Sequence, residues 1–291
     1  MTETVEFKKR RDFGQVINDT FTFIRQNIKP LIKTYFTFCG LFVLASMATL
    51  LLQQFKMVNV INTVGGMRHT SGIGLYGVEY FLSLIFSFAS YSSMTVAVLS
   101  YIAIYVQKGN QTPTLDEVWG FFKYYFFRVF GSSFLLMLLL IIGFMFCLVP
   151  GFYLFPFIAM MFPIMVIENS SLSYSFSRSF SLIKENFWVT FGTLIIVWII
   201  VYACTTLIVL PTSLFNMLAM FSSKNPQMSL TLTLITTVLQ SLCQVFTIVP
   251  IITISLMYFN LVEEKESVGL MERISNFGNT EKPIDTRPEE Y

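Results

Sequence analysis

The stretch FLLMLLLIIGFMFCLVPGFYLFPFIAMMFPIMVI, residues 134–167, decides the fold class. Its 34 residues contain no charged side chain. A helix needs about 20 apolar residues to cross a bilayer, so the stretch is long enough for two crossings. Pro150 and Gly151 in its middle predict a tight turn. We therefore expect a helical hairpin that lies within a membrane.

The composition of the whole chain agrees with a membrane protein. Of its 291 residues, 54% are hydrophobic and 12% are charged, whereas soluble domains carry about 25% charged residues. A water-soluble globule of this composition would expose large apolar patches. The 19 basic and 17 acidic residues give a net charge of +2, which excludes a broad basic surface for nucleic acid. The predicted class is an all-α, polytopic membrane protein.

Apolar runs predict six transmembrane helices. They are Leu31–Leu52, Tyr80–Val106, Val129–Val149, Phe152–Ile167, Val189–Leu210 and Ser229–Val262. The last run exceeds one crossing, so we expect it to tilt, to kink at Pro250 or to project beyond the headgroups. The chain then divides into an N-terminal region (1–30), a six-span domain (31–262) and a C-terminal tail (263–291), whose last dozen or so residues we expect to be disordered.

The lysine and arginine counts predict the orientation of these spans. Segments 1–33, 107–128, 168–188 and 263–291 hold 16 of these residues, and segments 53–79, 150–151 and 211–228 hold 3. Cytoplasmic segments carry the basic excess. The first apolar run begins only at Leu31, after the basic cluster KKRR at 8–11, so we expect no signal peptide. Both termini are assigned to the cytoplasm.

An amphipathic segment precedes each odd-numbered span. The first carries apolar residues at helical spacing: Phe13, Ile17, Phe21, Ile24 and Ile28. An offset of 159 repeats them as Leu172, Phe176, Phe180, Ile183 and Phe187, and an offset of 98 repeats them more loosely as Leu115, Trp119, Phe122 and Phe126. The predicted architecture is three units, each an interfacial helix plus a helical hairpin. The interfacial helices either fix the depth of the spans or form a groove for a partner or a lipid.

The spans hold almost none of the groups that catalysis requires, so we expect a protein that is not an enzyme and has no metal or cofactor. They do carry mild polarity. One face of the sixth span contains Thr233, Thr237, Gln240, Gln244 and Thr247, at spacings of four, three, four and three. This candidate polar face either forms hydrogen bonds between packed helices or lines a cavity for a lipid headgroup or small solute.

Two further patterns predict helix packing. Ala89, Ser93 and Ala97 form a row of small residues on the second span, which favours close approach of a neighbouring helix. Glu168 and Arg178 lie ten residues apart across a turn in which Ser170 or Ser171 can cap the next helix. A salt bridge between Glu168 and Arg178 would hold that helix against the end of the fourth span.

Residues 148–192 resemble the membrane domain of bacterial glycerophosphoryl diester phosphodiesterases and related stand-alone membrane proteins of unknown function. The resemblance rests on a Pro-Gly turn, a glutamate that ends an apolar span, an Arg-Ser pair in a serine-rich helix and an aromatic-Gly entry to the next span. Here these are Pro150, Gly151, Glu168, Arg178, Ser179, Phe191 and Gly192. The resemblance implies a helical domain of the bacterial inner (cytoplasmic) membrane, without the separate catalytic barrel of the enzyme.

Two functional hypotheses follow. The leading one is a non-catalytic inner-membrane scaffold or accessory subunit with a membrane protein partner. The reasons are polar residues that suit hydrogen bonds between packed helices, three interfacial helices and an accessible tail. The alternative is a transporter or binder of a lipid or small amphipathic solute that uses the sixth-span polar face. Membrane lipids are expected partners under both hypotheses, and nucleic acid under neither.

Overall fold

The computed structural model describes residues 5–64, 77–146, 148–222, 226–267, 271 and 274. Its helices are α1 (Phe13–Val64), α3 (Val78–Gln107), α4 (Leu115–Phe146), α5 (Leu148–Ile167), α6 (Leu172–Ile183), α7 (Phe187–Ser222), α8 (Pro226–Cys243), the 3₁₀ turn η1 (Gln244–Thr247) and α9 (Ile248–Glu266). The described residues contain no strand, and six of their helices are long and apolar enough to cross a membrane. The predicted fold class is confirmed. The expected disorder of the last dozen residues lies outside the described part.

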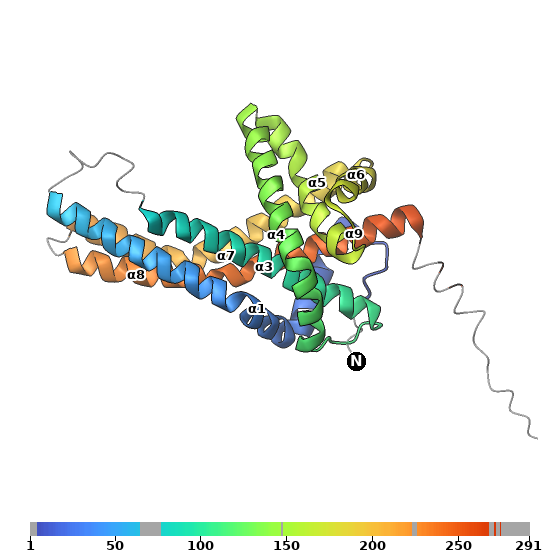
Figure 1. The fold of residues 1–291 in the computed structure, drawn as a ribbon, viewed down its shortest axis with the longest axis horizontal. Helices are drawn as coiled ribbons and strands as arrows, with labels where there is room; N and C mark the ends of the chain where they lie inside the picture. The colour runs from blue at the N-terminus through green and yellow to red at the C-terminus, as the bar shows by residue number, and fades with distance from the viewer. Residues whose placement is uncertain are drawn as a thin grey trace, which may run out of the picture.

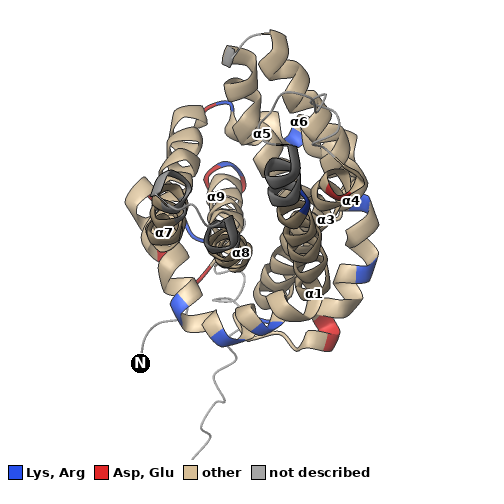
Figure 2. Ribbon diagram, turned by 90° about the vertical axis from the view of Figure 1, so that its left-hand side faces the viewer, with Lys and Arg blue, Asp and Glu red and all other residues tan. Residues whose placement is uncertain are grey.

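The helices form an elongated bundle with one divergent arm. Helices α1, α7 and α8 run along the long axis, and the α4–α5 hairpin splays away from them (Figure 1). Helix α8 contacts both α1 and α7. Viewed along the bundle, lysine, arginine, aspartate and glutamate occupy short, separated stretches of a ribbon that otherwise carries neither charge (Figure 2). Most of the helical surface is therefore suited to hydrocarbon.

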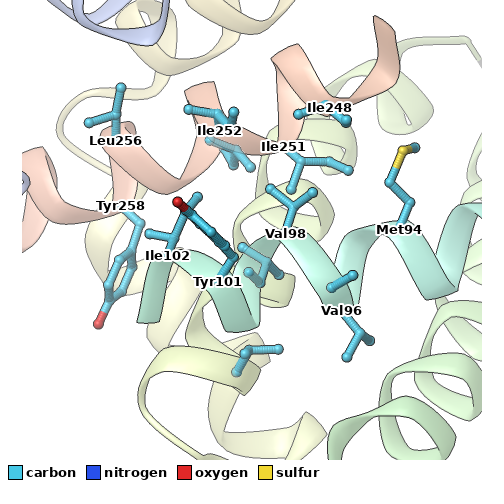
Figure 3. Close-up of a cluster of buried hydrophobic side chains, with 14 of the residues drawn as sticks. Met94, Val96, Val98, Tyr101, Ile102, Ile248, Ile251, Ile252, Leu256 and Tyr258 are labelled. Atoms are coloured by element: carbon cyan, nitrogen blue, oxygen red, sulfur yellow. The ribbon is translucent and has the colours of Figure 1, made fainter. Parts of the chain in front are cut away.

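Helix α3 forms the centre of the bundle. Every residue from Ser92 to Tyr105 is buried, because α1, α4, α5 and α9 all contact this helix. Figure 3 shows Val98 and Ile102 of α3 facing Ile251 and Ile252 of α9. The largest hydrophobic cluster of the protein includes this interface.

The predicted row of small residues lies at a close helix contact. Ala89, Ser93 and Ala97 are buried, and the Ser93 hydroxyl donates to the Phe38 carbonyl oxygen of α1 over 2.9 Å. A side chain as short as serine reaches a backbone atom of the next helix only when the two backbones lie close together. Small residues at the contact allow that approach.

Two prolines interrupt the longest helical runs. In α1, Asn27 leaves helical geometry (φ −115°, ψ 19°) three residues before Pro30, which lacks the N–H that would bond to the Gln26 carbonyl oxygen. In the last run, η1 separates α8 from α9 just before Pro250. The ring of a proline clashes with the carbonyl four residues earlier, here that of Phe246, and displaces the regular helix. The expected break near Pro250 is therefore present.

The predicted turn at Pro150 and Gly151 is wrong. Helix α4 ends at Phe146 and α5 begins at Leu148, so both residues belong to the first turn of α5. Proline suits a first turn, where its missing N–H would have no helical acceptor. Gly151 lies where the arms of the hairpin approach: a Cβ on Gly143 would lie 3.4 Å from the Gly151 Cα atom. The pair therefore starts a helix and allows close packing.

The three amphipathic segments take three different forms. The first lies before the Asn27 kink of α1, the second runs without a break into the rest of α4, and the third is the separate helix α6. The hairpins themselves are in contact, since α1 packs on α3, α4 on α5 and α7 on α8. The arrangement in three equivalent units stays a prediction.

Segments that the charge count assigns to the cytoplasm gather at one end of the bundle. The Arg11 amide donates to Asn260 Oδ1 over 2.7 Å, and the Asn186 amide donates to Glu264 over 2.9 Å. The Phe7 ring contacts the Tyr105 ring near the end of α3, with centroids 5.9 Å apart. Residues 5–12, the ends of α3 and α9, and the start of α7 are thus at the same end.

Candidate functional site

A lateral cleft lies between the splayed α4–α5 hairpin and the helices α3, α7 and α9. It consists of three neighbouring cavities that share lining residues and have volumes of about 650, 260 and 50 Å³. Phe155 of α5 lines all three, Leu140 of α4 joins the two larger ones, and Trp198 of α7 joins the largest to the smallest. We call this space the hairpin cleft.

Large apolar side chains form the walls of the hairpin cleft. Those of its largest part are Leu140, Phe144, Phe152, Phe155, Phe191, Ile195, Trp198, Ile199 and Tyr202. None of these is a small residue, and none carries a charge at neutral pH. The walls therefore present a continuous hydrocarbon and aromatic surface, which suits an apolar ligand.

Two residues with hydroxyl groups, Tyr91 of α3 and Ser133 of α4, line the middle cavity. The Ser133 Oγ is buried with no hydrogen-bond partner among the described residues. A serine hydroxyl can donate one hydrogen bond and accept others. The Ser133 Oγ is covered by protein atoms, so this residue leaves the surface of the cleft mainly apolar.

Aromatic packing on α6 and α7 supports the base of the hairpin. The Phe157 ring of α5 stacks on the Phe180 ring of α6, with centroids 3.9 Å apart and planes 8° apart. Tyr153 of α5 contacts Phe187, the first residue of α7, at 5.1 Å between centroids. These contacts lie along α5 beside the cleft, so they fix the angle at which the hairpin leaves the bundle.

Polar contacts join the end of α5 to α6 and α9. The predicted pair is present: Arg178 Nε lies 3.3 Å from Glu168 Oε1. The same carboxylate oxygen accepts a hydrogen bond from the Tyr258 hydroxyl at 2.8 Å, and Arg178 Nη2 lies 2.6 Å from Glu266. Burial opposes the charged form of Arg178, but Glu266 and Glu168 together raise the pKa of its guanidinium above the usual value. We call Glu168, Arg178, Tyr258 and Glu266 the polar clasp.

The serines beside the clasp have separate structural roles. Ser171 is the N-cap of α6 and accepts a hydrogen bond from the Tyr174 amide. Ser170 instead bonds to Ser175, with 2.8 Å between the hydroxyl oxygens. Ser179 is buried and donates back to the Phe176 carbonyl oxygen. These bonds shape the turn and helix that bring Arg178 to Glu168.

The predicted polar face of the sixth span does not line the hairpin cleft. Thr237 is buried, whereas Gln240 is exposed on α8. Ser90 of α3 donates weakly to Gln244 over 3.5 Å, and the Thr247 hydroxyl lies 3.4 Å from the Met94 sulfur. These contacts join helices. The 3₁₀ geometry of residues 244–247 also turns Gln244 and Thr247 relative to Thr233, Thr237 and Gln240, because a 3₁₀ helix has fewer residues per turn.

The N-terminal segment adds a buried feature that the sequence did not indicate. Phe7 is 1% exposed, and its ring meets those of Phe23 and Phe259 at 5.1 and 5.3 Å between centroids. The Arg11 side chain donates to the Phe7 carbonyl oxygen over 2.8 Å and pairs with Asp19 at 2.8 Å. Nothing distinguishes Phe7 in the sequence except that it is an aromatic residue beside a basic cluster.

Among the residues that the structure describes, no three His, Cys, Asp or Glu side chains lie close enough to hold a metal ion. The fold defines an integral membrane protein with six candidate spanning helices. No family model, curated protein or solved structure matches the chain.

Proposed function

We propose that this protein is a non-catalytic membrane protein that binds the hydrocarbon chains of a lipid in the hairpin cleft. The observation that carries the proposal is the lining of the cleft. Its largest part, about 650 Å³, is bounded by apolar and aromatic residues alone. In a membrane, the material available to fill such a lateral space is lipid or another protein.

The residue types favour a lipid chain over a transmembrane helix of a partner. Helices that dock in membranes use small residues, which let two backbones approach closely. The cleft instead presents Phe144, Phe155, Trp198 and other large side chains. A flexible acyl chain can follow such an uneven surface, whereas a rigid helix would leave gaps.

The test is to fill the cleft by substitution. Ile195 lines its largest part, so Ile195→Trp should displace a bound chain. Leu207→Trp is the matched control, because Leu207 lies on the same helix and is exposed away from these cavities. Each protein is purified in a mild detergent, and native mass spectrometry measures the fraction of molecules that retain lipid.

We expect the natural protein and the Leu207→Trp variant to retain lipid equally, and the Ile195→Trp variant to retain at least about tenfold less, the change that 1.4 kcal/mol of lost affinity produces. Equal retention by all three would overturn the proposal. Thermal unfolding of each variant separates loss of lipid from loss of the fold.

One observation favours a scaffold as the second candidate. The Gln240 side chain is exposed on a candidate spanning helix, and none of the described residues hydrogen-bonds to its amide. An amide that faces hydrocarbon is costly unless a partner satisfies it. A photo-crosslinking amino acid at position 240, in native membranes, would capture a stoichiometric protein partner under this hypothesis and lipids alone under the first.

The remaining parts of the proposal concern the membrane in which the protein lies and its orientation in that membrane. We infer that the end holding residues 5–12 and the polar clasp faces the cytoplasm of a bacterial cell, with the protein in the inner membrane. The lysine and arginine distribution supports this orientation. The resemblance to the membrane domain of the phosphodiesterases supports the bacterial setting. A reporter fused after Gly109 should be cytoplasmic and one fused after Lys56 should lie on the other side of the membrane, and the reverse result would contradict the orientation.

A further inference from the structure

Three cations form a stripe on α1 at its bend. Arg25, Lys29 and Lys33 are spaced four residues apart, and all three are exposed. They flank the Asn27 kink and Pro30. Residues four apart lie on one face of a helix, so Lys29 and Lys33 share a face after the bend, and Arg25 lies one turn earlier, before the Asn27 kink.

An exposed apolar stripe borders the three cations. Ile28, Ile32 and Phe36 are also spaced by four and are 48%, 39% and 56% exposed. Each of them follows one of the basic residues by three positions, so the two stripes are neighbours on the helix surface. Side by side, they match the boundary between headgroups and acyl chains, where long basic side chains reach the polar layer.

No acidic side chain among the described residues pairs with the three cations of the stripe. None of Arg25, Lys29 and Lys33 pairs with a described residue, and no acidic residue lies three or four positions from any of them. Like charges four residues apart destabilise a helix. Two carboxylates at this end pair with other cations, Asp19 with Arg11 at 2.8 Å and Glu117 with Lys108 at 2.5 Å. An anion from outside the protein would relieve the repulsion.

A bias in charge between the two sides of the membrane does not by itself explain this arrangement. The bias depends on how many lysines and arginines a segment carries. It does not require them to align on one face, nor to lie beside a row of exposed isoleucine and phenylalanine. Both features follow if a lipid occupies the surface.

We propose that residues 25–36 of α1 form a binding site for an anionic phospholipid. The headgroup phosphate lies against Arg25, Lys29 and Lys33, and an acyl chain lies along Ile28, Ile32 and Phe36. This site shares no residue with the hairpin cleft and does not depend on the function proposed for it. Its selectivity is for the charge of the headgroup, whereas that of the cleft is for hydrocarbon.

The test compares lipids that differ in headgroup charge. The purified full-length protein in a mild detergent is titrated with dioleoyl phosphatidylglycerol and, separately, with dioleoyl phosphatidylcholine, and native mass spectrometry counts the adducts. We expect a preference of at least tenfold for the anionic lipid, because three basic residues that contribute about 1 kcal/mol each exceed the 1.4 kcal/mol that a tenfold change requires. Inorganic phosphate should not compete, because it lacks the chain that contacts the apolar stripe.

Two variants separate the stripe from overall charge. Lys29→Gln with Lys33→Gln removes two of the three cations of the stripe, and it should abolish the preference. Lys123→Gln with Lys184→Gln removes two exposed cations elsewhere and should leave the preference intact. Equal binding of the two lipids to the natural protein, an unchanged preference in the Lys29→Gln, Lys33→Gln variant, or efficient competition by phosphate would each overturn the site.

Discussion

The Tyr101 hydroxyl donates a hydrogen bond to Asn27 Oδ1 over 3.0 Å. Both residues are buried, and the bond joins the central helix α3 to the one residue of α1 that leaves helical geometry. Asn27 in turn donates from its side-chain amide to the Phe23 carbonyl oxygen over 3.2 Å. The bend of α1 is therefore held by α3, and Pro30 alone does not account for it.

Replacing Tyr101 by phenylalanine should lower the stability of the protein. The change leaves Asn27 Oδ1 buried without its donor, and an unsatisfied buried acceptor costs about 1–3 kcal/mol. Thermal unfolding in detergent measures the loss. Tyr202→Phe is the control, because the Tyr202 ring is exposed and surface changes stay within about 0.5 kcal/mol. Equal stability of the two variants would contradict a structural role for the bond.

Replacing Phe7 by alanine should release the N-terminal segment. The ring is enclosed by Phe23, Tyr105 and Phe259, and removal of a buried phenylalanine costs about 3–5 kcal/mol. Trypsin should then cut faster at Lys8, Lys9 and Arg10. Phe13→Ala, at a partly exposed ring, should leave the cleavage rate nearly unchanged. A Phe7 variant as resistant as the natural protein would mean that the segment is held by Arg11 instead.

The polar clasp should show a larger coupling energy than a surface ion pair. A double-mutant cycle of Glu168→Ala and Tyr258→Phe isolates their hydrogen bond, and bonds to charged groups contribute about 1.5–3 kcal/mol. The comparison cycle uses Arg10→Gln and Glu264→Gln, whose side chains are 71% and 37% exposed and 3.7 Å apart. Exposed pairs contribute up to about 1 kcal/mol. Chemical unfolding of the two sets gives both energies.

Gly151→Ala should strain the α4–α5 hairpin. A Cβ at Gly151 would clash with the Phe144 ring, and such overpacking costs about 1–3 kcal/mol. Adding Phe144→Ala should recover part of this loss. At Gly192, by contrast, a new Cβ meets no atom within 4 Å, so Gly192→Ala should be neutral or stabilising by up to about 1 kcal/mol. Unfolding temperatures of the three variants decide between these outcomes.

The six spans could be predicted because charged residues are nearly absent from them, and this absence does not depend on how the helices pack. The hairpin cleft could not be predicted in the same way. Lipid is as apolar as a protein core, so Leu140, Phe144 and Phe155 would be equally suitable on a lipid-facing surface, in a core or in a cleft. Their position follows from the angle of the hairpin, which depends on contacts such as Phe157 with Phe180.

The wrong prediction of a turn at residues 150–151 has a related cause. Proline followed by glycine is typical of a turn, but proline is also favoured in the first turn of a helix, and glycine where two helices approach closely. Residues 150–151 serve these last two purposes. The Glu168–Arg178 pair, in contrast, could be predicted, because the turn between them is short and both residues flank apolar helices whose ends were visible in the sequence.

The central position of α3 has a consequence for how the chain enters the membrane. Helix α3 has the lowest mean hydropathy of the six candidate spans, and α9, which covers it in the finished protein, begins 141 residues after α3 ends. Helix α1 precedes α3 in the chain, and the Ser93–Phe38 bond joins these two helices. We therefore expect α1 and α3 to leave the insertion machinery as a pair, because α1 is made long before α9.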